Sequence, residues 1–289
     1  MMDYKNLIMN SKSVRSFKDE AIDEKVFNEI KDFVLSSKVL VPGIEIGIKF
    51  FEKEEIFNKI NGLAGYEGFL VDAPYYMVMV SEDKPHYTAN AGYIGEKARL
   101  KATDLGVDSC WITFNDGDKI LENIGADLGK KLVALIAFGH AKEAKKKMIN
   151  PTKSGENYSK SEMAKAFDAP SERKAIEEIV YMDKWGQAVD LDALEERALL
   201  DAFSYVRLAP SALNRQPWRF IVDGGKVVLV VDEAELGSGY EGRIDSGIAM
   251  LYFGAVIDAT LLDSKWDLDA DLSKYEIPEG FRAVGYCNV

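Results

Sequence analysis

The spacing of apolar residues along the chain predicts a mixture of helices and strands. Apolar positions at helical spacing predict a helix from Glu24 to about Ser36, which Asp23 caps, and a second long helix from about Ala89 through Leu105, with Gly106 as its C-cap glycine. Short apolar or alternating runs predict strands at residues 44–51, 75–80, 132–139, 226–231 and 283–287. Residues 108–114 fit a strand or a loop.

Further helices complete the pattern. Short helices are predicted at residues 54–62 and 118–124. Later in the chain, Asp190 caps a helix predicted from about Leu191 to Tyr205, and a strongly apolar helix begins at Asp245 and reaches about Leu262. Between these two helices, the loop Leu208–Trp218 runs directly into a strand.

Residues 142–169 differ from the rest of the chain in composition. They contain a lysine triplet at 145–147, Pro151, Gly155 and many small polar residues, which is typical of an exposed insertion. The lysines are most simply a solvated face, with a phosphate contact as the alternative. We therefore divide the chain into a first half, residues 1–170, and a second half, residues 171–289, which opens with a crossing segment.

Matching residues in the two halves indicate an internal duplication. Gly92, near the start of the first long helix, matches Gly247, and Trp111 past the end of that helix matches Trp266; both pairs are 155 positions apart. Tandem copies normally pack about a pseudo-twofold axis, as the subunits of a homodimer do. We therefore expect a monomer with internal pseudo-twofold symmetry.

Bulk composition narrows the classes of function. Hydrophobic content of 47% and charged content of 29% are globular values. A net charge of −12 argues against non-specific nucleic-acid binding, which needs a basic surface. No apolar run reaches bilayer length and no secretory signal opens the chain, so we expect a cytoplasmic protein without a membrane partner. Cys110, Cys287, His86 and His140 lack metal-ligand spacing, so no metal site is expected.

Two polar segments are candidates for ligand binding. Hydroxyls and cations alternate in the segment Ser11–Phe17, which suits an anion such as a phosphate, although an ordinary polar loop has the same pattern. The loop Leu208–Trp218 carries two amides between two prolines and can hold a flat ligand with polar edges. At the positions of Asn214 and Gln216 the first half has Ile46 and Ile48. A site that combines both segments therefore forms only once.

The sequence resembles the flavin-dependent nitroreductases. Ser13-Val14-Arg15-Ser16-Phe17 is similar to the amino-terminal R-R-S-x-R-x-F pattern of that family, and the loop Ala209–Trp218 is similar to its A-P-S-x-x-N-x-Q-P-W motif. Residues 105–112 resemble L-G-x-x-S-x-W-I, and residues 173–180 resemble R-K-P-L-E-E-I-V. The arrangement is most like nitroreductases in which two subunits are fused into one chain. The resemblance implies an α+β, three-layer sandwich whose two copies intertwine, with FMN at their interface.

Residues that match the family motifs are implied to bind the cofactor. Ser13 and Arg15 are expected on the phosphate or pyrimidine side of FMN, Arg173 at the phosphate, and Thr113 near the reactive flavin nitrogen. The first two arginines of the amino-terminal motif are Ser11 and Lys12 here, which implies weaker phosphate binding. The complete implied set is Ser11, Lys12, Ser13, Arg15, Thr113, Arg173, Pro210, Ser211, Ala212, Asn214 and Gln216.

The implied function is an FMN-dependent oxidoreductase that takes hydride from NAD(P)H and reduces a small substrate such as a nitroaromatic or a quinone. All redox chemistry is expected on the flavin, with no catalytic side chain. Two alternatives stay open: a flavin-binding or flavin-storage protein without turnover, and a structural protein with both sites degenerate. Trp111, Phe114, Tyr93 and Tyr240 are candidates for lining the pocket, and each fits a core position as well.

Overall fold

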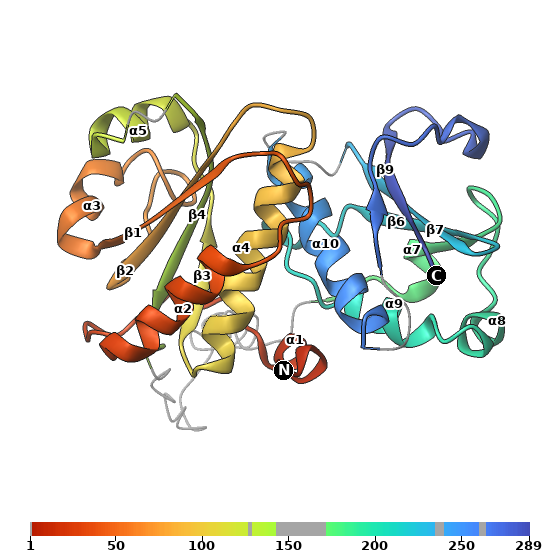
Figure 1. Cartoon of the computed structure of the whole chain (residues 1–289), viewed down its shortest axis with the longest axis horizontal. Coiled ribbons are helices and arrows are strands. Elements are labelled where there is room, and N and C mark those ends of the chain that lie inside the picture. Colours follow the sequence, from red (N-terminus) through yellow and green to blue (C-terminus); the bar gives the residue numbers. More distant parts are fainter. Residues whose placement is uncertain (1, 127–128, 143–171, 235–239, 260–263) are drawn as a thin grey trace, which may run out of the picture.

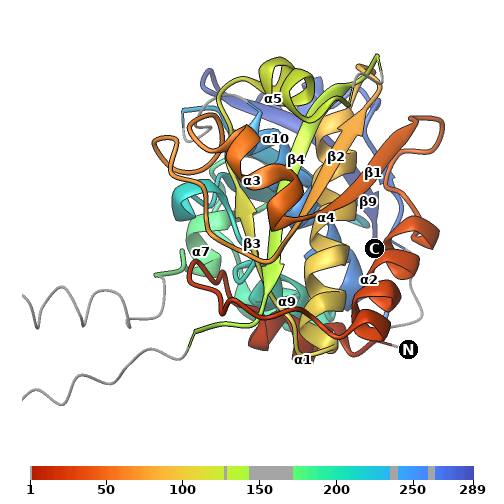
Figure 2. The same cartoon turned by 90° about the vertical axis from the view of Figure 1, so that its left-hand side faces the viewer.

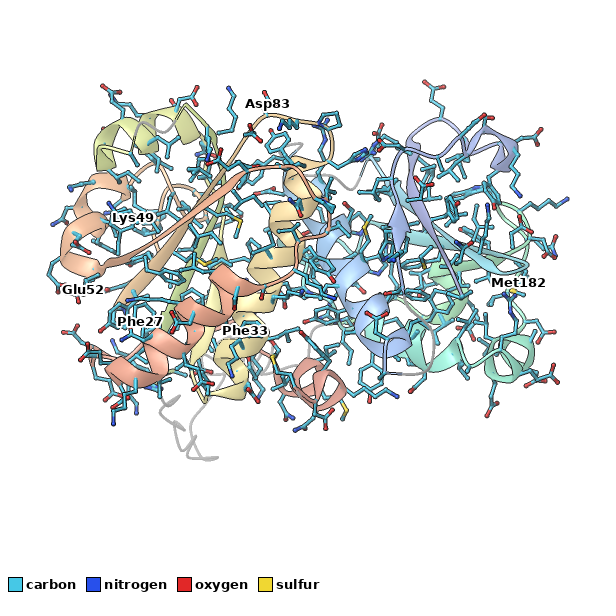
Figure 3. All side chains as sticks on the ribbon, viewed as in Figure 1. Phe27, Phe33, Lys49, Glu52, Asp83 and Met182 are labelled. Carbon is cyan, nitrogen blue, oxygen red and sulfur yellow. The ribbon has the colours of Figure 1, made fainter. Side chains whose placement is uncertain are left out.

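The computed structural model describes residues 2–126, 129–142, 172–234, 240–259 and 264–289. Two β-sheets stand on either side of a central pair of helices, α4 (Tyr87–Asp104) and α10 (Glu241–Ile257) (Figure 1). Lys49 in the first sheet and Met182 in the second lie toward opposite ends of the molecule (Figure 3). The helix pair is thus the middle layer of a three-layer sandwich, and the predicted α+β architecture is confirmed.

The first sheet has the strand order β1-β2-β4-β3, with every neighbouring pair antiparallel. Its strands are β1 (Ile46–Glu52), β2 (Tyr75–Ser81), β3 (Asp108–Ile112) and β4 (Lys131–Gly139). Helices α3 (Lys53–Ile60) and α5 (Gly117–Ile124) cover one face, and α2 (Glu24–Ser36) and α4 cover the other (Figure 2). Tyr76 and Val78 of β2 pack on the first of these faces, and Met77 and Met79 on the second. Burial on both faces explains why this strand reads as a continuous apolar run.

The second sheet repeats this order and adds one strand. Its strands are β5 (Val180–Met182), β6 (Trp218–Asp223), β7 (Lys226–Asp232), β8 (Trp266–Asp267) and β9 (Phe281–Asn288), in the order β5-β6-β7-β9-β8. Without β5, this order matches that of the first sheet strand for strand, and Trp111 in β3 corresponds to Trp266 in β8. β5 pairs with β6 in parallel, whereas every other neighbouring pair is antiparallel. The segment between the halves therefore extends the second sheet.

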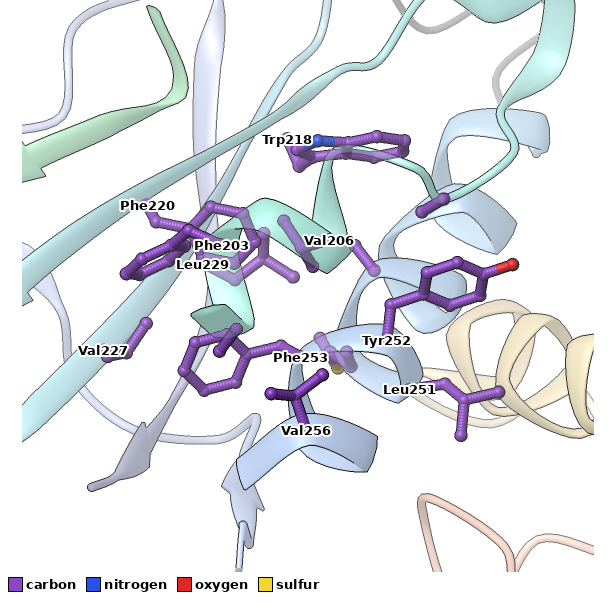
Figure 4. Close-up of a cluster of buried hydrophobic side chains, with 14 of the residues drawn as sticks. Phe203, Val206, Trp218, Phe220, Val227, Leu229, Leu251, Tyr252, Phe253 and Val256 are labelled. Atoms are coloured by element: carbon purple, nitrogen blue, oxygen red, sulfur yellow. The ribbon is translucent and has the colours of Figure 1, made fainter. Parts of the chain in front are cut away.

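A cluster of aromatic side chains fills the space between the second sheet and its helices (Figure 4). Phe203 lies on α9 (Leu200–Val206), Phe220 on β6 and Phe253 on α10, with ring centroids 5.3 to 6.1 Å apart. Trp218, at the end of the loop, is 1% exposed and belongs to the same cluster. Tyr252 points away from this cluster, toward α4 (Figure 4).

The two central helices touch at the glycines that the repeat pairs. A Cβ atom on Gly92 would lie 2.1 Å from the carbonyl oxygen of Ile244, and one on Gly247 would lie 1.9 Å from the carbonyl oxygen of Ala89. Ala89 and Ile244 are themselves 155 positions apart, so the two contacts are equivalent under the repeat. Only glycine permits this approach of two helix backbones.

The helix predicted from Leu191 to Tyr205 is two helices, so that prediction is wrong at its centre. The first helix, α8 (Leu191–Glu196), ends at Glu196, and the second helix, α9, begins at Leu200. The Leu199 amide donates to the Leu194 carbonyl oxygen and the Ala198 amide to that of Glu195, with Ala198 in the left-handed region at φ 57°. This is a Schellman ending. It turns the chain so that both Leu194 and Leu199 are buried.

Other boundaries differ from the predictions in smaller ways. The capped helix at 24–36 is confirmed, because the Asp23 carboxylate accepts hydrogen bonds from the Lys25 and Val26 amides. α10 begins at Glu241, four positions before Asp245, and ends at Ile257, so the predicted end at about Leu262 is wrong. The predicted insertion also lies outside them, apart from Lys142. The remaining short elements are α1 (Tyr4–Asn10), α7 (Ile176–Ile179), η2 (Ala212–Asn214) and η3 (Ser273–Tyr275). None of the described helices has the length and apolar character to span a bilayer.

Candidate functional site

A cavity of about 470 Å³ lies between the two halves of the chain. From the first half, its wall includes Ser13, Arg15 and Thr113. From the second half it includes the loop 210–213 and four residues of α10, which are Glu241, Ile244, Asp245 and Ile248. Neither half encloses this space alone.

The amino-terminal segment reaches the cavity because it pairs with β3. Ser13 forms a parallel bridge with Ser109, and the Val14 amide donates to the Ser109 carbonyl oxygen at 3.1 Å. Side chains two apart in an extended segment point the same way, so Ser13 and Arg15 both face the cavity. The Lys12 carbonyl oxygen faces the interior and accepts a hydrogen bond from Nη2 of Arg99 at 3.1 Å.

A buried ionic cluster lies behind this wall. The Glu96 carboxylate accepts hydrogen bonds from Arg99 Nη1 at 3.0 Å, from Trp111 Nε1 at 2.8 Å and from the Tyr252 hydroxyl at 2.9 Å. Burial, together with the Glu96 charge, raises the pKa of Tyr252 well above its ordinary value. The cluster joins α4, β3 and α10, and through Lys12 it also fixes the amino-terminal segment.

The loop that closes the cavity from the second half has an unusual backbone. Leu213, Asn214 and Gln216 all have φ between 49° and 56°, a region that side chains rarely occupy. Two hydrogen bonds support it: the Gln216 amide donates to Ser211 Oγ at 2.9 Å, and the Ala212 amide donates to the Asp245 carboxyl at 3.1 Å. Local contacts thus impose the conformation that presents residues 210–213 to the cavity.

Asp245 is a buried carboxyl in the cavity wall. It is 4% exposed, and burial raises its pKa well above the ordinary value. Within the described part of the chain, the Ala212 amide is its one hydrogen-bond donor. The sequence predicts Asp245 only as the first residue of a helix and carries no signal for a role at a ligand.

Arg173 of the crossing segment lies against Asn214 of the loop, and neither these two residues nor Gln216 line the cavity. Nη1 of Arg173 donates to the Ala209 carbonyl oxygen at 2.8 Å and to Asn214 Oδ1 at 3.2 Å. Nδ2 of Asn214 donates to the Glu172 carbonyl oxygen at 2.9 Å, and Gln216 Oε1 accepts from the Lys174 amide at 2.9 Å. The two amides therefore hold the crossing segment against the loop.

The structure thus divides the eleven residues of the predicted site. Ser13, Arg15, Thr113, Pro210, Ser211 and Ala212 line the cavity, whereas Ser11, Lys12, Arg173, Asn214 and Gln216 do not. Of the four candidate aromatic residues, Trp111 and Tyr240 line it, whereas Phe114 and Tyr93 do not.

Aromatic side chains form much of the remaining wall. Tyr240 stacks on Phe114, with ring centroids 4.5 Å apart, and its hydroxyl accepts the Phe114 amide at 3.1 Å. Burial raises the pKa of Tyr240 above its ordinary value. Tyr66 and Phe69 also line the cavity, although they are 65% and 77% exposed. Sequence reasoning missed both, and the one local signal was three glycines within residues 62–68.

A long helix pair between two sheets that share one antiparallel strand order, with a cavity between the two halves, defines a nitroreductase-type fold. The chain belongs to the family described as "Putative TM nitroreductase", whose sequence profile matches residues 3–256. It is similar over 99% of its length to a crystal structure described as a putative nitroreductase from Thermotoga maritima MSB8, at 18% identity and a TM-score of 0.60, covering 94% of that chain.

Shorter relatives match part of the chain. An FMN-dependent nitroreductase from Clostridium difficile R20291 shares 19% identity over 51% of this chain and 98% of its own, with a TM-score of 0.41. A nitroreductase with bound FMN from Bacteroides fragilis NCTC 9343 shares 18% identity over 54% of this chain and 98% of its own, also with a TM-score of 0.41. Comparison with curated proteins gives no match.

Proposed function

We propose that this protein is an FMN-dependent oxidoreductase that takes electrons from NADH or NADPH and passes them to a small oxidising substrate such as a quinone or a nitroaromatic. The observation that carries the proposal is the composite cavity, with Ser13, Arg15 and Thr113 on one side and the loop 210–213 on the other. One chain with its two halves, 1–170 and 171–289, is the proposed functional unit, acting as a monomer in the cytoplasm.

The residues of the cavity suit a flavin. A volume of about 470 Å³ with largely apolar walls suits a planar ring system. Arg15 would hold the pyrimidine part of bound FMN through its guanidinium, and Thr113 would contact the ring through its backbone. Pro210, Ser211 and Ala212 would hold the ring from the second half. Arg173 would hold the phosphate with the guanidinium nitrogens that the loop does not use.

The chain positions the reactants and limits access of water, while bound FMN supplies the hydride and electron transfer. Ile112, Ile244 and Ile248 make one part of the wall apolar, which would strengthen the hydrogen bonds that Arg15 donates to a bound flavin. Tyr66 and Phe69 stand at the exposed side, where an aromatic acceptor can stack against them.

Reconstitution tests the proposal. The protein is mixed with excess FMN, freed of unbound flavin and titrated anaerobically with NADH and then NADPH. We expect retained flavin absorbance and bleaching by one of the two donors. Retained absorbance without bleaching by either donor identifies the flavin-storage alternative, and absence of flavin rejects both.

A matched pair of variants localises the site. Arg15→Gln is expected to weaken FMN binding by about tenfold or more, because a charge-assisted hydrogen bond is lost. Arg282→Met removes one positive charge from a surface ion pair with Glu233 and is expected to leave FMN affinity unchanged. Equal affinities of the two variants would place the flavin elsewhere.

A further inference from the structure

Two guanidinium groups converge on the crossing segment beside the cavity. Nη1 of Arg173 is anchored on the Ala209 carbonyl oxygen at 2.8 Å, and Nε of Arg207 is anchored on the Lys174 carbonyl oxygen at 2.6 Å. Both side chains are partly buried. Among the described residues no carboxylate forms an ion pair with either group. Each guanidinium group is therefore held in place through one of its nitrogens, while its other N–H donors stay available.

Such an arrangement suits an anion. Burial is the largest cause that lowers the pKa of Arg173, and the like charge of Arg207 lowers it further. The two guanidinium groups therefore repel each other in a poorly solvated place. The chain carries 48 acidic side chains, so carboxylates that could pair with these two arginines are abundant. A phosphate group offers several acceptor oxygens that two forks can share.

The packing of α1 on α9 shows where Arg207 lies. The two helices run side by side (Figures 1 and 2), with an ion pair between Lys5 and Asp201 and a contact of 3.7 Å between the Tyr205 hydroxyl and Met9 Sδ. Both contacts join residues 196 positions apart, so the helices are parallel and in register. Ser11 and Arg207 are the C-cap residues of these helices and are also 196 positions apart, so the two helices end at the same level.

Ser11 stands where the nitroreductase motif R-R-S-x-R has its first arginine. We infer that Arg207, reaching in from α9, supplies the second guanidinium of the phosphate site together with Arg173 and so replaces the arginine that position 11 lacks. This inference rests on the proposed function, because it assigns the phosphate of FMN as the anion.

Two ligands with the same ring separate a phosphate contact from a structural one. Dissociation constants for FMN and for riboflavin, which has no phosphate, are measured by flavin fluorescence with the full chain. Arg207→Met is expected to weaken FMN binding by about ten- to a hundredfold and to leave riboflavin binding within about twofold. Arg207→Lys keeps the charge without the fork and is expected to fall between the two.

Two further variants make the test specific. Arg197→Met is the matched control, since Arg197 is also in the second half but donates to the Gly224 carbonyl oxygen; its FMN affinity should equal that of the wild type. Restoring the motif with Ser11→Arg in the Arg207→Met background is expected to recover most of the lost FMN affinity, because both positions serve one site.

Other outcomes overturn the inference. If Arg207→Met weakens FMN and riboflavin equally, or changes neither, Arg207 does not contact the phosphate. If Ser11→Arg gives no recovery while the double variant unfolds at the wild-type temperature, positions 11 and 207 do not share a site. Wild-type protein that binds neither flavin refutes the proposed function, and the inference falls with it.

Discussion

The crossing of α4 and α10 gives a sharp test of the fold at the centre of the molecule. In Gly247→Ala, the added methyl carbon would lie 1.9 Å from the carbonyl oxygen of Ala89 and 3.0 Å from the amide nitrogen of Tyr93. Real contacts of this kind essentially never fall below 3.0 Å, so the two helix backbones have to separate by about 1 Å. No side-chain rotation relieves the clash, because the opposing atoms belong to the backbone.

The expected cost follows from two opposing effects. Alanine is better than glycine in a helix by about 0.5–1 kcal/mol. Overpacking of a core costs about 1–3 kcal/mol, and displacement of a whole helix belongs at the upper end. We therefore expect a net loss of about 2 kcal/mol in the free energy of unfolding, which lowers Tm by roughly 3 °C for a protein of this size.

Urea and thermal unfolding followed by circular dichroism measure this change. Gly225→Ala is the control, because its added methyl carbon would lie 3.6 Å from the Val289 carbonyl oxygen, an ordinary contact, and its stability should stay within about 0.5 kcal/mol of the wild type. FMN affinity should also fall in Gly247→Ala, since Asp245 and Ile248 of the displaced helix line the cavity. If Gly247→Ala is as stable as the wild type, the two helices do not approach as described.

Strands and helices with a strong apolar pattern were predictable from the sequence. β2 and β4 are buried on both faces, so their apolar runs are continuous and unambiguous. The break between α8 and α9 was not predictable, because Ala198 adopts a left-handed conformation that usually marks glycine. Burial of Leu199 favours this turn, and that burial comes from residues distant in the sequence.

The candidate site was predictable where a short motif carries it. Ser13, Arg15 and the loop 210–213 line the cavity, whereas Asn214, which the motif also predicts at the ligand, does not line it. Its amide instead fixes Glu172, and a motif does not distinguish a residue that faces a ligand from one that shapes the loop. Phe69 was missed because its position depends on the packing of a glycine-rich turn.

Two further substitutions test individual groups in the cavity wall. Tyr240→Phe keeps the ring on Phe114 but removes the acceptor of its amide, and urea unfolding should show a loss of about 1 kcal/mol; an unchanged stability would mean that water replaces the hydroxyl. Asp245→Asn is expected to stabilise the protein at neutral pH, because Asn90 occupies the equivalent position in the first half and an amide can still accept from Ala212. Since burial raises the folded pKa of Asp245 above the ordinary value of 3.8, the folded state keeps a proton that the unfolded chain releases. The wild type therefore loses stability as the pH rises above that value. The loss is about 1.4 kcal/mol for each tenfold by which folding lowers the acid dissociation constant of Asp245, and the variant lacks this loss. Unfolding measured from pH 4 to pH 8 should show the two proteins diverging as pH increases, and parallel curves would mean that Asp245 is ionised in the folded protein.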